Sequence, residues 1–555
     1  MQKLSCSSYD ELLSRFSLDV PASYNFAFDD LDRIADATAD GSGNPLAIVH
    51  VDDAGERRDY TFAWLKEASS RLANVLKAQG LRKGDRVMLV LYRRIEFWVS
   101  MLACHKLGAV PVPSPAQLTP KDIVFRVNRA NIRGMIVEDS ITDRVEAARP
   151  DCASLSCLVQ VGGASCPAGW LDYAAAVADA SPDFPKPQGA ELAGGSDSLL
   201  IFFSSGTTGM PKMVEHTHTY PLGHYMTGAY WHDLEEGDLH LTLADTGWGK
   251  AVWGKFYGQW LAGATVFVWD FRGKFEPARL LEQLAAHKVT TFCAPPTVYR
   301  FLVREDLSTY DLSALRHCTT AGELLNDSVF HDWKKQTGLP IYEGYGQTET
   351  TLQICTLRTM EPKPGSIGRA APGWDIVLRD LRGNICPPGE EGEICVRIAE
   401  GIPVGLFTGY LEDPEKTASV MLNGYYHTGD KAWMDEDGYF WFLGRVDDLI
   451  KSSGYRIGPF EVESALISHE AVVEAAVTGV PDDLRGQIVK ATVVLAPGFA
   501  PSPELTKALQ DHVKKVTAPY KYPRIIDYVS ELPKTISGKI RRVEIRQRDE
   551  EAAKK

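Results

Sequence analysis

The sequence lacks the features that would anchor, crosslink or export the chain. No stretch approaches the roughly 20 consecutive apolar residues of a membrane-spanning helix. Residues 1–17 carry Asp10 and Glu11 and have neither a secretory signal pattern nor the Arg-rich, acid-poor composition of a transit peptide. The ten cysteines form no Cys-x-x-Cys pair, and no histidine spacing completes a zinc site near Cys152, Cys157 and Cys166. We therefore expect reduced thiols, no membrane insertion and a cytoplasmic location.

The chain also lacks an excess of positive charge. It has 59 Lys and Arg against 73 Asp and Glu, a formal net charge of -14. Nucleic-acid binding needs an electropositive footprint, so the balance argues against nucleic acid as a partner. No internal repeat or low-complexity tract is present, and 555 residues with 44% hydrophobic content predict a globular protein of more than one domain.

Helical and strand-like segments alternate over most of the chain, which predicts an α/β architecture. Residues 65–79 and 97–107 have helical spacing, whereas residues 86–92 and 199–203 are short apolar runs typical of buried strands. A Pro- and Gly-rich loop over residues 182–197 leads into the second run. After about residue 370, β-like segments punctuated by Gly and Pro dominate.

The pattern changes again after Arg445. Residues 460–467 and 503–516 favour helices, and residues 472–480 and 490–495 favour strands. These elements are enough for a separate α+β domain of about a hundred residues. We predict a large N-terminal domain over residues 1–444 and a small C-terminal domain over residues 445–555.

The strongest chemical feature is Ser204-Ser-Gly-Thr-Thr-Gly-Met-Pro-Lys212, directly after the apolar strand. Glycines let a backbone approach a polyphosphate, hydroxyls and amides donate hydrogen bonds to its oxygens, and a lysine adds charge. The segment is not a Walker loop, because Pro211 precedes the lysine, Met213 follows it, and residues 213–218 do not favour a helix. A flexible Ser/Gly turn is the alternative. The predicted phosphate contacts are Ser204, Ser205, Gly206, Thr207, Thr208, Gly209 and Lys212.

Five motifs in order resemble the adenylate-forming superfamily of acyl-CoA synthetases, luciferases and peptide-synthetase adenylation domains, over nearly the whole chain. They are the phosphate loop, Glu343-Gly-Tyr-Gly-Gln-Thr-Glu349, Tyr426-His-Thr-Gly-Asp430, Gly444-Arg-Val-Asp447 and Pro533-Lys-Thr-Ile-Ser-Gly-Lys539. The resemblance implies α/β subdomains plus a β-barrel-like subdomain in the large domain, with a mobile small domain. It also implies ATP, Mg²⁺ and coenzyme A as cofactors, and it allows a homodimer.

The resemblance assigns the nucleotide site residue by residue. Glu349 is expected to hold Mg²⁺, a hard ion that prefers oxygen ligands, and Thr348 to reach the α-phosphate. Asp430 is expected to hold the ribose hydroxyls. Arg445 is expected to present its donor fork to ribose or phosphate, and Arg456 to reach the departing phosphates. The remaining expected nucleotide contacts are Gly322, Glu323, Glu343, Gly344, Tyr345, Gly346 and Gln347. In Ala321-Gly-Glu-Leu324 the chain departs from the family's frequent Gly-Glu-Pro, which leaves the rigidity of that loop in doubt.

The same resemblance implies two half-reactions separated by domain rotation. Lys539 is the expected catalytic residue of adenylate formation, and Asp447 matches the hinge. After rotation a thiol tunnel reaches the adenylate; its expected coenzyme A contacts are Ser453, Gly454, Tyr455, Arg485, Lys514 and Tyr522. For any one of these residues taken alone, a solvated or ion-paired surface group is the alternative.

Coenzyme A is the expected acceptor, because only residues 540–555 follow Lys539 and no carrier domain is seen there. A stand-alone ligase that loads a separate carrier is the alternative. Luciferase-type oxidation fits less well, since Ser452-Ser-Gly-Tyr-Arg-Ile-Gly458 and Tyr520-Lys-Tyr-Pro-Arg524 most resemble medium-chain acyl-CoA synthetases.

Gly346 indicates the size of the acid. Acetyl-CoA synthetases resemble this motif but carry a tryptophan there, so glycine is expected to admit a medium-chain, branched, alicyclic or aromatic acid. A short-chain or benzoate-type ligase is the alternative. Trp248 is an expected wall of the acyl pocket, or else an ordinary core aromatic. The histidines at 216, 218 and 224 are expected to line a loop or pocket, with metal binding as the weaker hypothesis.

Overall fold

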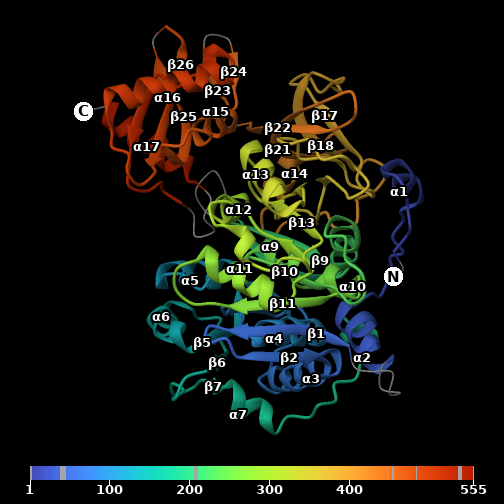
Figure 1. The fold of residues 1–555 in the computed structure, drawn as a ribbon. Helices are drawn as coiled ribbons and strands as arrows, with labels where there is room; N and C mark the ends of the chain where they lie inside the picture. Colours follow the sequence, from blue (N-terminus) through green and yellow to red (C-terminus); the bar gives the residue numbers. More distant parts are fainter. Residues whose placement is uncertain are drawn as a thin grey trace.

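In the computed structural model a nine-stranded mixed sheet and a five-stranded parallel sheet form the middle and lower parts of the molecule, and the C-terminal part of the chain lies above them (Figure 1). The structure describes residues 3–37, 45–204, 211–446, 448–452, 455–482, 484–534 and 540–553, without the side chains of Arg456, Glu550, Ala552 and Ala553.

The larger sheet has nine strands, and its inner six are parallel. In spatial order they are β16 (Arg369–Ala370), β15 (Ile354–Cys355), β14 (Ile341–Tyr345), β13 (His317–Ala321), β12 (Thr291–Cys293), β10 (Leu239–Thr242), β11 (Thr265–Asp270), β1 (Leu46–Asp52) and β2 (Arg57–Thr61). The second sheet is parallel throughout: β4 (Val110–Pro113), β3 (Arg86–Val90), β5 (Ile132–Glu138), β6 (Cys157–Val161) and β7 (Leu171–Asp172).

Helices pack against these sheets, and several of the helices are themselves buried. They include α1 (Tyr9–Arg15), α2 (Arg33–Ala37), α3 (Phe62–Ala78), α4 (Ile95–Leu107), α5 (Pro120–Arg129), α6 (Thr142–Ala148), α7 (Tyr173–Ala178), α8 (Tyr220–Tyr225), α9 (Gly249–Gly254), α10 (Tyr257–Leu261), α11 (Pro277–Ala286), α12 (Pro296–Leu302) and α13 (Asp327–Thr337). α4 is apolar on nearly all sides, so it is buried, and it ends at Gly108, whose φ of 76° suits a left-handed cap. Its Trp98 indole donates a 2.8 Å hydrogen bond to the Lys255 carbonyl.

The third part of the large domain is antiparallel, as the Gly- and Pro-rich pattern after residue 370 predicts. One sheet contains β17 (Ile376–Arg379), β18 (Glu391–Arg397), β21 (Tyr425–Met434), β20 (Met421–Leu422) and β22 (Phe440–Arg445), beside α14 (Pro414–Val420). A smaller sheet joins β8 (Ser198–Ser204), β9 (Lys212–Thr217) and β19 (Gly409–Tyr410).

The C-terminal lobe, drawn red in Figure 1, has its own sheet and core. Its strands are β24 (Tyr455–Ile457), β23 (Ile450–Ser452), β26 (Gly486–Leu495), β25 (Val472–Asp482) and β27 (Ile525–Tyr528), with helices α15 (Pro459–Ile467), α16 (Pro503–Val516) and α17 (Arg542–Ala553). Asn326 contacts the lobe through hydrogen bonds from its Nδ2 to the Ser464 carbonyl (3.1 Å) and hydroxyl (3.0 Å).

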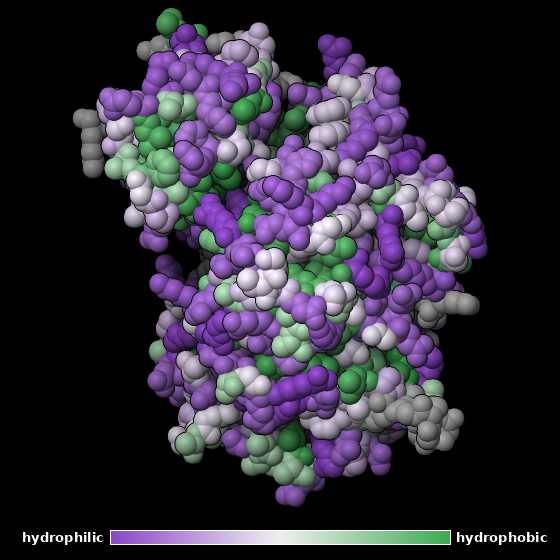
Figure 2. Space-filling model, in the orientation of Figure 1, coloured by the Kyte–Doolittle hydropathy of each residue, from purple (hydrophilic) through white to green (hydrophobic). Residues whose placement is uncertain are grey.

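The surface between the lobe and the large domain is hollowed, and hydrophobic side chains gather at the lobe's lower edge, whereas the outward faces are mostly hydrophilic (Figure 2). None of the helices in the described ranges combines the length and apolar character needed to cross a bilayer.

Candidate active site

The predicted nucleotide motifs meet at the carboxyl edge of the nine-stranded sheet. β13 and β14 are parallel neighbours that end at Ala321 and Tyr345, so the segments that follow them emerge at the same edge. Ligands of open α/β sheets bind outside the carboxyl ends of the strands. The Ala321-Gly322-Glu323 segment and the Gly346-to-Glu349 segment therefore begin side by side, although they are more than twenty residues apart in sequence.

Asp430 is the centre of a hydrogen-bonded cluster that joins two motifs. Its Oδ2 accepts hydrogen bonds from the Tyr345 hydroxyl (2.6 Å) and Gln347 Nε2 (2.6 Å). Tyr426 donates to Gln347 Oε1 at 2.6 Å, which fixes the orientation of the amide. Burial, together with the Asp430 charge, raises the pKa of Tyr345 well above its usual range, so the phenol remains a donor. Asp430 is opposite Arg445 in the register of β21 and β22, which brings the two predicted ribose contacts together.

Glu349 is held by segments that sequence reasoning did not connect with it. The Tyr410 hydroxyl donates to Glu349 Oε1 at 2.9 Å, and Phe407 N–H donates to the Glu349 carbonyl at 2.8 Å. Lys212 Nζ lies 5.0 Å from the centroid of the Tyr410 ring. Burial lowers the pKa of Lys212 below its usual range. Tyr410 thus contacts both the lysine of the predicted phosphate loop and the predicted magnesium ligand.

The predicted phosphate loop connects two antiparallel strands. Ser204 at the end of β8 is opposite Lys212 at the start of β9, so the two strands that flank the loop are paired antiparallel up to its ends. The prediction that no helix follows Lys212 is confirmed, which separates this loop from the strand–loop–helix of a Walker motif. The predicted contacts Ser205, Gly206, Thr207, Thr208 and Gly209 lie outside the described residues.

Two residues that were predicted to contact the nucleotide, Glu343 and Glu323, form hydrogen bonds with other parts of the protein. Glu343 is buried, and its Oε1 accepts the Leu325 N–H at 2.9 Å. Burial is the main cause that raises the pKa of Glu343 to about 8. Glu323 is exposed and accepts a 2.8 Å hydrogen bond from the Thr297 hydroxyl. Neither carboxyl forms a hydrogen bond to Tyr345, Gln347 or Asp430 among the described contacts. Gly344 and Gly322 lie beside them, and a Cβ at Gly344 would be 2.6 Å from the Trp231 ring.

The space beside Gly346 is occupied by a residue that the sequence reading missed. A Cβ at Gly346 would lie 2.3 Å from Trp253 Cη2 and 2.6 Å from the Thr351 carbonyl. Glycine is therefore required for this packing, and Trp253 on α9 fills the volume that the missing side chain leaves. Trp248 is half-buried at the N-terminal end of the same helix. Thr348 lies next to this helix, with its Cγ2 4.0 Å from a Cβ placed on Gly249.

One of the three histidines noted in the sequence, His216, contacts the Gly346-to-Glu349 segment. His216, His218 and His224 are buried, and burial lowers the pKa of His216 and His218 to about 4, so they are neutral near pH 7. His216 Nε2 is 2.8 Å from the Thr348 carbonyl oxygen and its ring stacks on Tyr220 with centroids 3.8 Å apart. These contacts let His216 position the backbone of Thr348.

The predicted coenzyme A contacts in the described part of the lobe form two aromatic groups. Tyr455 stacks on Tyr520 with ring centroids 4.1 Å apart, and both rings are exposed. Lys514 Nζ lies 4.3 Å from the Tyr522 ring centroid. Arg485 is 3.9 Å from the Asp482 carboxylate. Asp447, Ser453, Gly454, Lys539 and the side chain of Arg456 lie outside the described residues.

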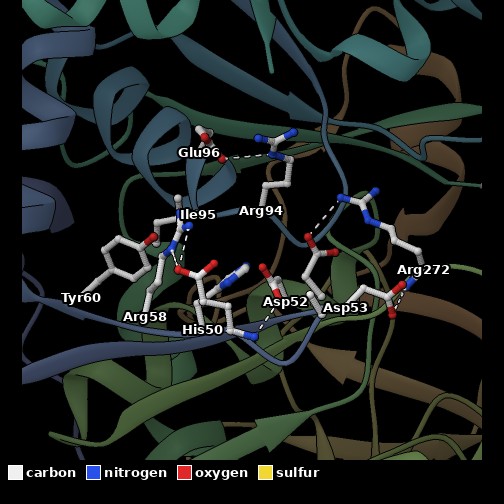
Figure 3. Close-up of a pocket in the computed structure, with 12 residues that line it drawn as sticks. His50, Asp52, Asp53, Arg58, Tyr60, Arg94, Ile95, Glu96 and Arg272 are labelled. Atoms are coloured by element: carbon white, nitrogen blue, oxygen red, sulfur yellow. Dashed lines mark hydrogen bonds and ion pairs between the residues drawn. The ribbon is translucent and has the colours of Figure 1, made fainter. Parts of the chain in front are cut away.

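A polar cavity of about 310 Å³ lies elsewhere on the same sheet, at the ends of β1 and β11 (Figure 3). Its lining includes Asp52, Asp270, Arg94 and Arg272, and the arginines pair with neighbouring carboxylates. No predicted site residue lines it, so the candidate nucleotide site lies at the hydrogen-bonded clusters around Asp430 and Glu349 rather than at this cavity.

Comparison with protein families decides the assignment. Residues 36–411 match the AMP-binding enzyme family and residues 461–539 match the AMP-binding enzyme C-terminal domain. The chain belongs to the AMP-binding enzyme family. Two relatives in this AMP-binding family are acyl-coenzyme A synthetase ACSM3 of Pongo abelii, 42% identical over 98% of this chain and 92% of the relative, and ACSM5 of Mus musculus, 45% identical over 97% and 93%. The AMP-binding enzyme described here is thus similar to acyl-CoA synthetases along its whole length.

Solved structures agree with the α/β fold of this AMP-binding enzyme. The anthranilate CoA ligase AuaEII in complex with anthranoyl-AMP aligns with a TM-score of 0.87 at 31% identity, covering 97% of this chain and 99% of that one. A benzoate CoA ligase from Burkholderia xenovorans LB400 aligns with a TM-score of 0.79 at 28% identity, covering 94% and 100%.

The predicted cytoplasmic location is wrong for this AMP-binding enzyme. The ACSM3 and ACSM5 relatives are both named as mitochondrial proteins. The prediction rested on the composition of residues 1–17, and a leader pattern missing from one short segment does not determine the compartment in which a protein works.

Proposed function

We propose that this acyl-CoA synthetase activates a medium-chain or ring-bearing carboxylic acid with ATP, through the clusters around Asp430 and Glu349, and transfers the acyl group to coenzyme A. The observation that carries the residue assignment is the hydrogen bonding of Tyr345 and Gln347 to Asp430, which joins two separate nucleotide motifs in one site. AMP and pyrophosphate are the other products.

In the first half-reaction the acid's carboxylate attacks the α-phosphorus, and repulsion between the two anions must be offset by positioning and by cations. Asp430 accepts the ribose hydroxyls while Tyr345 and Gln347 hold its carboxylate in place. Lys212 and Arg445 supply fixed positive charge on the phosphate side. Thr348 donates to the α-phosphate, and His216 fixes the Thr348 backbone from below.

The donor set around Glu349 fits a magnesium ion, because a carboxylate with one oxygen oriented by a tyrosine hydroxyl still offers a hard oxygen ligand. When bound, Mg²⁺ supplies charge neutralisation to the phosphates. The roles of Glu349 and Tyr410 in this proposal are to hold and orient that ion.

Lys539 neutralises charge at the α-phosphate during adenylate formation in this proposal, and residues 445–555 then rotate about Asp447 relative to residues 1–444. Rotation brings Tyr455, Lys514 and Tyr522, with Gly454 and Arg485, toward the adenylate. The exposed Tyr455–Tyr520 stack and the Lys514–Tyr522 contact support an aromatic and basic surface suited to the adenine and phosphates of coenzyme A. A homodimer stays a prediction.

An aromatic acid is the second candidate substrate. Two structural neighbours are ligases of anthranilate and benzoate, and Trp253 places an aromatic ring beside Gly346. Because an apolar pocket distinguishes neighbouring acids by only about 1–3 kcal/mol per methylene, a panel of acids compared by kcat/KM separates the two candidates.

Separate assays of the two half-reactions test the whole proposal. Lys539→Ala should abolish acid-dependent pyrophosphate release but still convert supplied acyl-adenylate and coenzyme A into thioester. Lys534→Ala is the matched control, since Lys534 precedes the same loop and pairs with Glu474 at 2.6 Å. Equal loss of both half-reactions in Lys539→Ala would mean that the lysine has a structural role. Transfer of the acyl group to a purified carrier protein but not to coenzyme A would overturn the assignment of coenzyme A as the acceptor.

A further inference from the structure

A cluster of potential metal ligands lies on the antiparallel sheet behind the Asp430 motif. Glu393 and Cys395 lie on β18, and His427 lies on β21 directly opposite Cys395. His427 Nδ1 is 2.9 Å from Glu393 Oε2 and 3.5 Å from Cys395 Sγ. Over the described ranges this is the one group of three such side chains whose ligand atoms all lie within 4.8 Å of one another.

The geometry argues against a nucleophilic triad. In a relay of that kind one imidazole nitrogen faces the nucleophile and the other faces the carboxylate. Here both contacts fall on Nδ1 of His427, and its Nε2 is buried without a hydrogen-bond partner among the described residues. A single nitrogen aimed at both a thiol and a carboxylate is instead the arrangement of ligands around a shared cation.

The spacing fits a zinc ion. Zn²⁺ binds nitrogen, sulfur and oxygen at about 2.0–2.3 Å, so tetrahedral ligands lie about 3.4 Å (N to O) and about 3.5 Å (N to S) apart. The observed Nδ1-to-Sγ distance of 3.5 Å already matches. The Nδ1-to-Oε2 distance of 2.9 Å would lengthen by about half an ångström. That shift is small for a half-buried glutamate side chain.

Two of the three potential ligands are accessible from solvent. Cys395 is fully buried, whereas Glu393 and His427 are half-buried, with side chains 24% and 22% exposed, which gives an ion access from solvent. Arg379 is opposite Glu393 in the sheet, but its guanidinium donates to the Gly383 carbonyl (2.6 Å) and lies 4.1 Å from the Tyr425 ring centroid. Arg379 therefore makes its contacts with Gly383 and Tyr425, and it forms no ion pair with Glu393 among the described contacts.

We propose that Glu393, Cys395 and His427 form a binding site for Zn²⁺, with water as the fourth ligand. Binding replaces the Cys395 S–H bond with a sulfur–zinc bond and releases that proton to solvent. Glu393 binds through Oε2 and keeps its Oε1 as acceptor of the Gly429 N–H, now 2.9 Å long. One backbone hydrogen bond thus connects the metal to the residue preceding Asp430.

The site is tested by zinc binding to the full chain, without substrates. The metal-stripped protein is titrated with zinc chloride in competition with a chromophoric chelator. We expect one tight equivalent, and affinity lower by more than about tenfold in Cys395→Ser, His427→Gln and Glu393→Gln. With Co²⁺, the wild type should show a thiolate-to-cobalt charge-transfer band that Cys395→Ser lacks.

Two controls exclude adventitious binding. Cys166→Ser removes a more accessible thiol, and His512→Gln separates the contacting His469–His512 pair, whose ring centroids are 5.2 Å apart. Both variants should bind zinc as the wild type does. Absence of a tight equivalent in the wild type, or its persistence in His427→Gln and Glu393→Gln, would overturn the proposal even if Cys395→Ser fails to fold. Acyl-CoA synthesis plays no part in these measurements, so they are independent of the proposed function.

Discussion

The Tyr345 hydroxyl donates a 2.6 Å hydrogen bond to Oδ2 of Asp430, a residue 85 positions later in the chain. Gln347 donates to the same oxygen at 2.6 Å. The two donors come from the last residue of β14 and from the segment that follows it, and the acceptor comes from the antiparallel sheet. This contact holds together the parallel and antiparallel parts of the large domain at the proposed ribose site.

Asp430→Asn should weaken ATP binding more than it lowers the stability of the folded protein. The substitution preserves shape but removes the charge that two donors and the ribose hydroxyls share, and hydrogen bonds to charged groups contribute about 1.5–3 kcal/mol. We expect kcat/KM for ATP to fall by roughly 10-fold to 100-fold. Steady-state kinetics with ATP varied measure this. Asp375→Asn is the control, because that carboxylate is exposed and pairs only with Arg397 among the described residues.

The sequence predicts individual helices and strands but not which distant segments they contact. The apolar runs and Gly or Pro boundaries located β3, β8, α4, α15 and α16 to within a few residues, because period and capping are local properties. The contacts of Tyr410 with Glu349 and of Trp253 with Gly346 depend on how distant segments pack, and no local pattern encodes them. Glu343 illustrates the same limit: its motif position predicts a nucleotide contact, yet its carboxyl is buried against Leu325.

Tyr410→Phe should raise the magnesium requirement. The variant keeps the ring beside Lys212 and removes only the hydroxyl that orients Glu349. Loss of a group that orients a metal-binding carboxylate costs about 10-fold to 100-fold in metal affinity. Pyrophosphate release measured against Mg²⁺ concentration should therefore shift to higher half-saturation. Tyr439→Phe, which loses a hydroxyl bonded to the Glu361 carbonyl, is the matched control.

If the Mg²⁺ curve of Tyr410→Phe coincides with that of Tyr439→Phe, Glu349 is not held for magnesium by this hydroxyl. Glu349→Gln then gives the stricter test, since it changes the carboxylate itself. It should require more Mg²⁺ than Tyr410→Phe does.

Trp253→Leu should change which acid is preferred. The indole fills the space beside Gly346, so a smaller side chain lengthens the pocket, and each added methylene accommodated there is worth about 1–3 kcal/mol. The ratio of kcat/KM for a longer acid to that for a shorter acid should rise by about tenfold or more. Trp374→Leu matches the change in volume and in burial, since both tryptophans are 7% exposed. A similar ratio in both variants would remove Trp253 from the acyl pocket.

Glu343→Gln should stabilise the protein increasingly as pH rises. Burial, the largest cause, raises the pKa of Glu343 from the ordinary 4.5 to about 8. Between these values the folded chain keeps the proton while the unfolded chain releases it, so the contribution of Glu343 to stability falls as pH increases. Glutamine is neutral in both states and lacks this dependence. The difference in unfolding free energy between variant and wild type should grow by up to about 1.4 kcal/mol per pH unit in this window.

Thermal unfolding at pH 5, 6.5 and 8 measures the effect as a Tm offset, which suits a chain with more than one domain better than an extrapolated free energy. Glu400→Gln makes the same substitution at an exposed turn position and is the matched control. Glutamine also keeps an oxygen that accepts the Leu325 N–H, so the offset reports the proton rather than a lost hydrogen bond. A constant offset for Glu343→Gln would mean that the carboxyl ionises in the folded protein at its ordinary pKa. It would also require water or a cation to reach Glu343, which burial in this structure opposes.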